Sequence, residues 1–137
     1  MPGQALVHII DKEWRVYLAT THYEITRGLG GLPSIPRGTG MLFDLGVEQS
    51  ITVTTVPMLF PLDIVFIDGS LVVNGLAYNV APGYLVRGEL PARYFLEVNA
   101  SEAQGIDAGD QVIISYLILS PQQGTSNSLV IFAAQAM

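Results

Sequence analysis

Short apolar runs, each ended by turn-forming residues, dominate this chain and limit what it can fold into. Val, Ile, Leu, Tyr and Phe fill these runs, and Gly, Pro, Asn and Asp separate them. Such a pattern is typical of many short β-strands. The segments that fit a strand are 5–10, 13–19, 40–43, 49–53, 62–67, 70–77, 94–98, 111–119 and 129–134.

The number and spacing of these strands predict a mostly β fold, either all-β or α+β. We expect a small closed or partly open β-barrel, because closure removes exposed strand edges. With 137 residues the chain is long enough for one core, and we expect a single domain over 1–137. Segment 120–128 is polar and is predicted to be the tip of a C-terminal hairpin.

Helix is scarce in the pattern. Thr20 or Thr21 is expected to cap one short helix that stops at the glycine cluster 28–31. A second short helix is expected within 99–105, after which Ile106 would return to the core.

The strongest turn signal is the Asp68-Gly69 pair between two apolar segments. It predicts a two-residue hairpin turn in which both residues take a positive φ. Alternation along the preceding strand then places Asp63 and Asp68 on opposite faces of the sheet. These two acids are therefore not expected to form a carboxylate pair.

Composition excludes several classes of function. Six Lys and Arg residues against twelve Asp and Glu give a net charge of −6, and the basic residues are scattered, so no nucleic-acid partner is expected. The chain has no Cys. His8 and His22 lack a second His at metal-ligand spacing, so no metal site is expected.

The usual cofactor and nucleophile motifs are missing as well. There is no Gly-x-Ser-x-Gly elbow, and the glycine clusters 28–31 and 38–40 lack the Lys-Ser/Thr of a phosphate-binding loop. We therefore expect no cofactor.

No membrane span is expected, because the longest apolar stretch, 53–67, is interrupted by Pro57, Pro61 and Asp63. The first residues do not have the basic and apolar regions of a signal peptide. We expect a cytoplasmic protein, or an exported one if the chain was trimmed from a longer precursor.

Several blocks of the chain resemble one uncharacterised family, the domain-of-unknown-function family 192. They extend over about 16–112, which leaves 113–137 as a C-terminal β-hairpin extension. The similar blocks are 16–20, 27–29, 40–43, 61–68, 92–100, 105–106 and 109–110. The resemblance implies a small, mostly β, barrel-like domain without an assigned activity, often found in exported bacterial proteins.

The chain departs from the family pattern at two places. Thr54 to Met58 stand where the family usually carries an aromatic, a Met, a basic residue, an Asn and a Thr, and Gly30 stands where it usually has Met. If the polar motif forms a site in relatives, this chain has lost most of it.

The candidate site residues lie next to this segment. The family pattern suggests Asp63 as an acid/base group or ligand contact, while a turn carboxylate that accepts backbone N–H bonds is the alternative. Arg93 could grip an acidic group of a ligand. Glu97 shares the strand face of Arg93, about 13 Å away. Each of these two residues could equally pair with a neighbouring strand.

The prolines around Met58 and Phe60 exclude a central strand there. These two side chains therefore either plug the end of the barrel or line an apolar groove.

Three functions fit these observations. The first is a non-catalytic binding module whose barrel mouth, at Met58, Phe60, Asp63 and Arg93, accepts a small ligand or an extended peptide. The second is a structural subunit that forms a homo-oligomer or larger assembly through the C-terminal hairpin. The third is an enzyme, which would require Asp63 to lie close to Arg93, a His or another polar group in one cleft.

Overall fold

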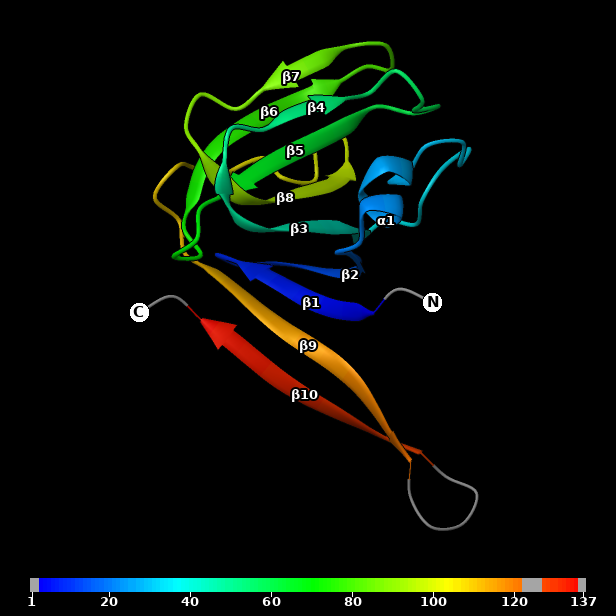
Figure 1. The fold of residues 1–137 in the computed structure, drawn as a ribbon, viewed down its shortest axis with the longest axis vertical. Coiled ribbons are helices and arrows are strands. Elements are labelled where there is room, and N and C mark those ends of the chain that lie inside the picture. Colours follow the sequence, from blue (N-terminus) through cyan, green and yellow to red (C-terminus); the bar gives the residue numbers. More distant parts are fainter. Residues whose placement is uncertain (1–2, 122–126, 136–137) are drawn as a thin grey trace.

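The computed structural model describes residues 3–121 and 127–135. Within these residues it contains one short helix and two β-sheets (Figure 1). The elements are β1 (Gln4–Ile9), β2 (Lys12–Ala19), α1 (His22–Arg27), β3 (Thr39–Gln49), β4 (Thr52–Thr54), β5 (Leu62–Ile67), β6 (Val73–Val80), β7 (Leu85–Arg87), β8 (Ala92–Asn99), β9 (Val112–Pro121) and β10 (Asn127–Gln135).

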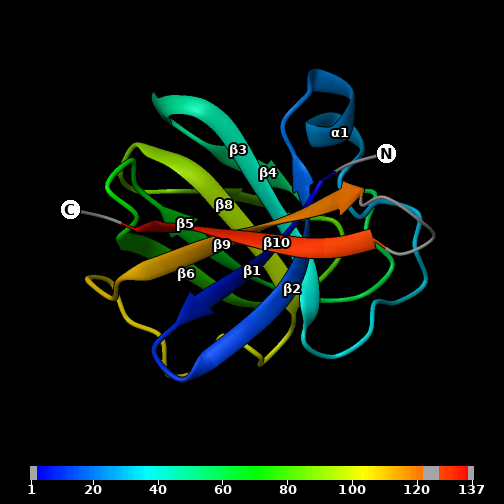
Figure 2. The same cartoon turned by 90° about the horizontal axis from the view of Figure 1, so that it is seen from below.

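The main sheet has eight strands in the order β10-β9-β1-β2-β3-β8-β5-β6, and β4 pairs with β7 in a small second sheet. Only β2 and β3 run parallel; the other pairs are antiparallel. The strands of the β1–β2 end cross those of β5 and β8 as the sheet twists (Figure 2). A bridge between Val72 and Gln111 ties the β6 end to β9 without closing the sheet. The prediction of a mostly β, partly open barrel-like fold is confirmed.

The centre of the main sheet is buried on both faces. All six residues of β5 are buried. Val65 and Ile67 face the first core, which the curled sheet encloses, whereas Ile64 and Phe66 face a second core beneath α1 and the β4–β7 sheet. The predicted alternation along this strand is confirmed. A cavity next to the second core can therefore be lined by main-sheet residues that remain shielded from bulk water.

The β5–β6 turn differs from the prediction. Asp68 N–H donates to the carbonyl of Val72, so three residues form the loop instead of two. The residue with positive φ at the turn is Leu71, at 61°, and Gly69 does not have one. The Asp68 carboxylate accepts the N–H groups of Ser70 and Val72, which satisfies the loop backbone by a side chain.

The first predicted helix is confirmed and the second is wrong. α1 begins after Thr21, whose side chain and Glu24 form a reciprocal capping box, and it ends at Gly28. In place of the second helix, 99–105 forms successive turns with hydrogen bonds between residues three apart. Ile106 is fully buried after these turns, as predicted.

The predicted strands are present, with shifted ends. β3 continues to Gln49, and β7 was not predicted. The C-terminal hairpin pairs β9 with β10 in a continuous register and extends away from the body of the molecule (Figure 1). The predicted tip falls partly on 122–126, outside the described residues, and the side chains of 118–135 are outside them as well. Among the described residues, no helix has the length and apolarity needed to cross a membrane.

Candidate functional site

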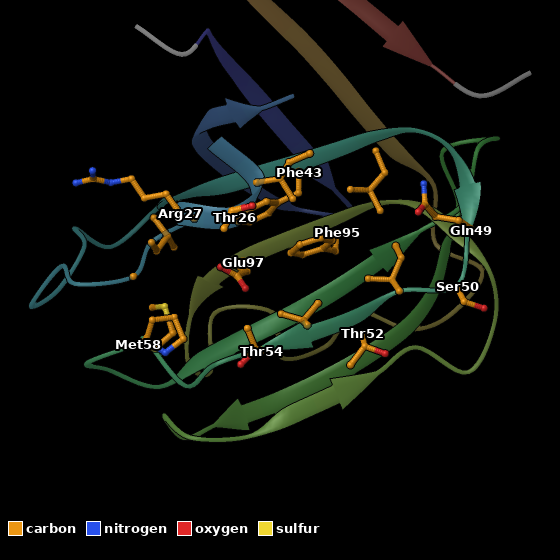
Figure 3. Close-up of a pocket in the computed structure, with 18 residues that line it drawn as sticks. Thr26, Arg27, Phe43, Gln49, Ser50, Thr52, Thr54, Met58, Phe95 and Glu97 are labelled. Atoms are coloured by element: carbon orange, nitrogen blue, oxygen red, sulfur yellow. The ribbon is translucent and has the colours of Figure 1, made fainter. Parts of the chain in front are cut away.

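A cavity of about 340 Å³ lies between the main sheet and the layer formed by α1 and β4 (Figure 3). Its walls come from four parts of the chain: the end of α1 with the following glycine loop, the segment 49–54, the turn at Pro57 and Met58, and strands β3 and β8. Segments distant in sequence thus enclose one space.

The glycine loop is shaped by close packing against the opposite wall. Gly28 has a φ of 50°, and a Cβ there would lie 3.2 Å from the Phe43 ring. A Cβ on Gly30 would lie 3.0 Å from the Cβ of Pro57. Gly31 N–H donates to the Pro57 carbonyl over 3.1 Å. The loop and the Pro57 turn are therefore joined at one side of the cavity, which explains why the departure at Gly30 suits this chain.

Aromatic rings form one side of the cavity. Phe43 of β3 and Phe95 of β8 are stacked, with centroids 4.1 Å apart and planes inclined by 9°. Both are buried, and Met58, also buried, lies on the wall across from them (Figure 3). These side chains give the site an apolar surface that could hold the body of a small organic molecule.

Glu97 places a carboxyl group in this apolar surface. Its side chain is 4% exposed and points into the cavity between Phe95 and Met58 (Figure 3). Its neighbours in the sheet register are apolar, Met41 on β3 and Ile64 on β5. Within residues 3–121 and 127–135, the carboxyl forms no hydrogen bond or ion pair.

Burial raises the pKa of the Glu97 carboxyl from its ordinary value of 4.5 to about 8. Desolvation is the cause, since no neighbouring charge contributes. The other charged residue of the lining is Arg27, whose guanidinium points away from the cavity and donates to the Tyr23 hydroxyl over 3.1 Å. In the empty site the carboxyl therefore carries its proton at pH 7.

The β3–β4 side of the cavity is formed by residues 49–54 (Figure 3). Ile51 and Val53 are buried and pack in the second core, whereas Ser50, Thr52 and Thr54 alternate with them and are exposed. The Thr54 hydroxyl accepts the Val56 N–H over 3.2 Å. The arrangement is an apolar pocket with one inner acid.

Of the four predicted site residues, Met58 lines this cavity and the other three do not. Phe60 is half-buried and packs against the second core. The sequence left open whether Met58 and Phe60 plug the end of the barrel or line a groove. In the structure Met58 lines the cavity. Leu59, which lies between them, is 63% exposed.

Asp63 holds two segments of backbone together. Its carboxylate accepts the N–H of Asn79 over 2.8 Å and the N–H of Ala103 over 2.9 Å, and the side chain is fully buried. This is the geometry of the turn-carboxylate alternative. Among the described residues, Asp63 forms no hydrogen bond with Arg93 or a His, two of the partners that the enzyme hypothesis named.

Arg93 pairs within the sheet. Its guanidinium donates to both carboxylate oxygens of Asp44, over 3.0 and 3.2 Å, and lies 4.9 Å from the centre of the Tyr94 ring. The hydrogen bond to Asp44 raises the pKa of Arg93. Arg93 is near the start of β8 and Glu97 is near its end, so the two side chains are attached towards opposite ends of the same strand.

The segment in which the family motif is altered has a structural role here. Thr55 is fully buried; its hydroxyl donates to the Ala81 carbonyl over 2.8 Å and accepts the Tyr84 N–H over 2.9 Å.

Across the described part of the chain, no group of three or more His, Cys, Asp or Glu side chains is placed to hold a metal ion.

Sequence reasoning placed Glu97 on the correct strand but did not include it in the site. An acidic residue between apolar neighbours in 94–98 was a signal, although the alternative of a cross-strand partner was equally open. Only the register, with Met41 and Ile64 beside it, shows that no such partner is present.

The comparisons agree with the predicted resemblance. The model of the family DUF192, described as "Uncharacterized ACR", matches residues 6–114. A crystal structure from Sinorhizobium meliloti, described as a "putative transcription regulator", has a TM-score of 0.77 at 24% identity and covers 81% of this chain and 93% of its own. A protein of unknown function from Novosphingobium aromaticivorans has a TM-score of 0.73 at 27% identity and covers 80% of this chain and 82% of its own. The search of curated proteins found no match.

Proposed function

The chain belongs to the DUF192 family, whose description names no activity, and we propose that this domain is a non-catalytic binding module that holds a small ligand in the Glu97 cavity. One observation carries the proposal: Glu97 is 4% exposed and faces the cavity, and its carboxyl has no hydrogen-bond partner among the described residues. Buried polar groups are almost always hydrogen-bonded, because an unpaired one costs free energy. A ligand that reaches Glu97 would remove that cost.

The size and lining of the cavity support a small ligand. About 340 Å³ lies at the lower end of the volumes typical of small-molecule sites. The stacked Phe43 and Phe95 rings and Met58 supply apolar contact, and the Glu97 carboxyl supplies a polar group. An apolar lining with a few polar groups is the usual composition of such sites. Met58 is the predicted site residue that this proposal retains.

A fragment screen on two matched variants tests the proposal. Ligand-observed NMR would be run with the wild-type chain, with Leu45→Trp to fill the cavity, and with Ala108→Trp as the control. Leu45 is half-buried and lines the cavity on the strand face of Phe43, whereas Ala108 is exposed in the turn before β9 and does not line it. Fragments that bind wild type and Ala108→Trp but not Leu45→Trp support the proposal. No binding at all, or binding that Leu45→Trp leaves unchanged, contradicts it. Extended peptides in the same screen test the other predicted ligand class.

A second candidate function is self-association through the C-terminal hairpin. β10 is the last strand of the main sheet and pairs on one side with β9, so its other edge is free of the strands described here. Such an edge can pair with another strand. Light scattering of the full chain at micromolar concentration would show a mass above one chain. A monomeric full chain contradicts this candidate.

A further inference from the structure

We propose that the ligand of the Glu97 cavity is a small organic cation, whose protonated amine binds the Glu97 carboxylate while its apolar body packs on Phe43, Phe95 and Met58. The inference rests on the proposed function, because it names a chemical class for the ligand of the same cavity.

The position of Glu97 favours a donor that comes from outside the chain. Met41 and Ile64 flank it in the sheet and offer no polar side chain. The Arg27 guanidinium is directed outward and is bonded to Tyr23. A carboxylate accepts hydrogen bonds at both oxygens, and an ammonium group provides three donors. A charge-assisted bond between these two groups is also stronger than a bond between neutral groups.

The surroundings of Glu97 favour a cation over an anion or a neutral ligand. Phe95 adjoins Glu97 and stacks on Phe43, and the faces of aromatic rings attract cations. The net charge of −6 draws cations toward the protein and repels anions.

Binding a cation would be coupled to release of a proton. The empty site holds a protonated carboxyl at pH 7, and an ammonium ligand requires the carboxylate. Besides Glu97, the charged residue of the lining is Arg27 on α1; β3, β4 and β8 contribute uncharged side chains to it. The affinity for a cation should therefore rise about tenfold per pH unit up to the pKa of Glu97 and then level off.

Three probes of similar shape test the charge preference: phenethylammonium, 2-phenylethanol and 3-phenylpropanoate. Titration calorimetry at pH 6, 7 and 8, in two buffers of different ionisation enthalpy, gives the affinity and the number of protons released. We expect phenethylammonium to bind best, to gain about tenfold in affinity per pH unit, and to release close to one proton at pH 6. At pH 8, Glu97→Gln should weaken phenethylammonium at least tenfold.

The outcomes separate this inference from the proposed function. If 2-phenylethanol or 3-phenylpropanoate binds as well as phenethylammonium and Leu45→Trp abolishes that binding, the cation inference is wrong and the proposed function stands. If affinity for phenethylammonium falls as pH rises, binding does not require the carboxylate and the inference is wrong. If no probe and no screened fragment binds, both proposals fail. The wild-type pH profile decides the question even if Glu97→Gln does not fold.

Discussion

Replacing Glu97 by Gln should stabilise the folded protein, and increasingly so as the pH rises. The folded state keeps the Glu97 proton up to a pH of about 8, whereas the unfolded chain loses it near 4.5. Between these values the folded state binds more protons than the unfolded state, so wild-type stability falls as the pH rises through that window. Gln has nearly the same shape and never ionises, so the variant escapes this loss.

The size of the effect follows from the two pKa values. A difference of about 3.5 pKa units corresponds to about 5 kcal/mol once the pH exceeds both values. At pH 7 the unfolded chain has lost the proton and the folded chain has not, which gives about 3 kcal/mol. Near pH 4 both states are protonated and the two proteins should differ little from this cause.

Urea unfolding at pH 4, 5.5, 7 and 8.5 measures the difference between wild type and variant. Trp14 is the only tryptophan and is 2% exposed, so its fluorescence should report unfolding. Glu89→Gln is the control, because it makes the same chemical change at an exposed position. A gap for Glu97→Gln that does not widen between pH 4 and pH 8.5 would refute the reasoning that this carboxyl is buried without a partner.

Three further substitutions test other parts of the structure by the same unfolding measurement. Asp63→Asn should cost about 2–3 kcal/mol, because one of two buried N–H donors would meet an amide NH2 group; a neutral result would contradict the backbone-tying role. Thr21→Ala should cost about 1 kcal/mol by breaking the capping box, and a loss of under a few tenths would argue against it. Gly40→Ala should cost about 3 kcal/mol or more, since its Cβ would overlap the Glu97 carbonyl oxygen and push β3 away from β8; unchanged stability would disprove that close approach.

The sequence predicted well those features that depend on local chemistry. Alternation places Val65 and Ile67 on one face of β5 and Ile64 and Phe66 on the other, as observed. The capping residues of α1 were equally readable, because Thr21 and Glu24 act within one turn. Short-range patterns contain this information, since each signal and its partner lie within a few residues.

Features that depend on distant contacts were not predictable in the same way. Asp68-Gly69 has the composition of a two-residue turn, but the loop extends to Leu71, which takes the positive φ and whose carbonyl accepts the N–H of Val112 at the start of β9. Likewise, 99–105 contains helix-forming residues but is held in turns where Asp63 accepts the Ala103 N–H. In both cases a bond to another strand or turn overrides the local preference.

The candidate site required the most distant information of all. Whether an acidic residue in a strand is paired depends on which residues stand beside it, and Met41 and Ile64 lie more than thirty positions away in sequence from Glu97. If either neighbour were basic, the same residues in 94–98 would form a cross-strand ion pair. Arg93 of β8 and Asp44 of β3 form an ion pair of this kind.

This contrast between Arg93 and Glu97 argues for a role of Glu97 beyond stability. Both lie on β8, and Arg93 has a carboxylate partner on β3, whereas Glu97 has apolar neighbours and a cavity. An unpartnered buried acid lowers the stability of the folded chain at neutral pH, and Leu would fit the same strand without that cost. Residues that break a local rule in this way are characteristic of functional sites. A cation that binds Glu97 would pair its carboxylate and remove the free-energy cost of the unpaired acid. The loss of stability and the binding affinity would then have the same physical origin.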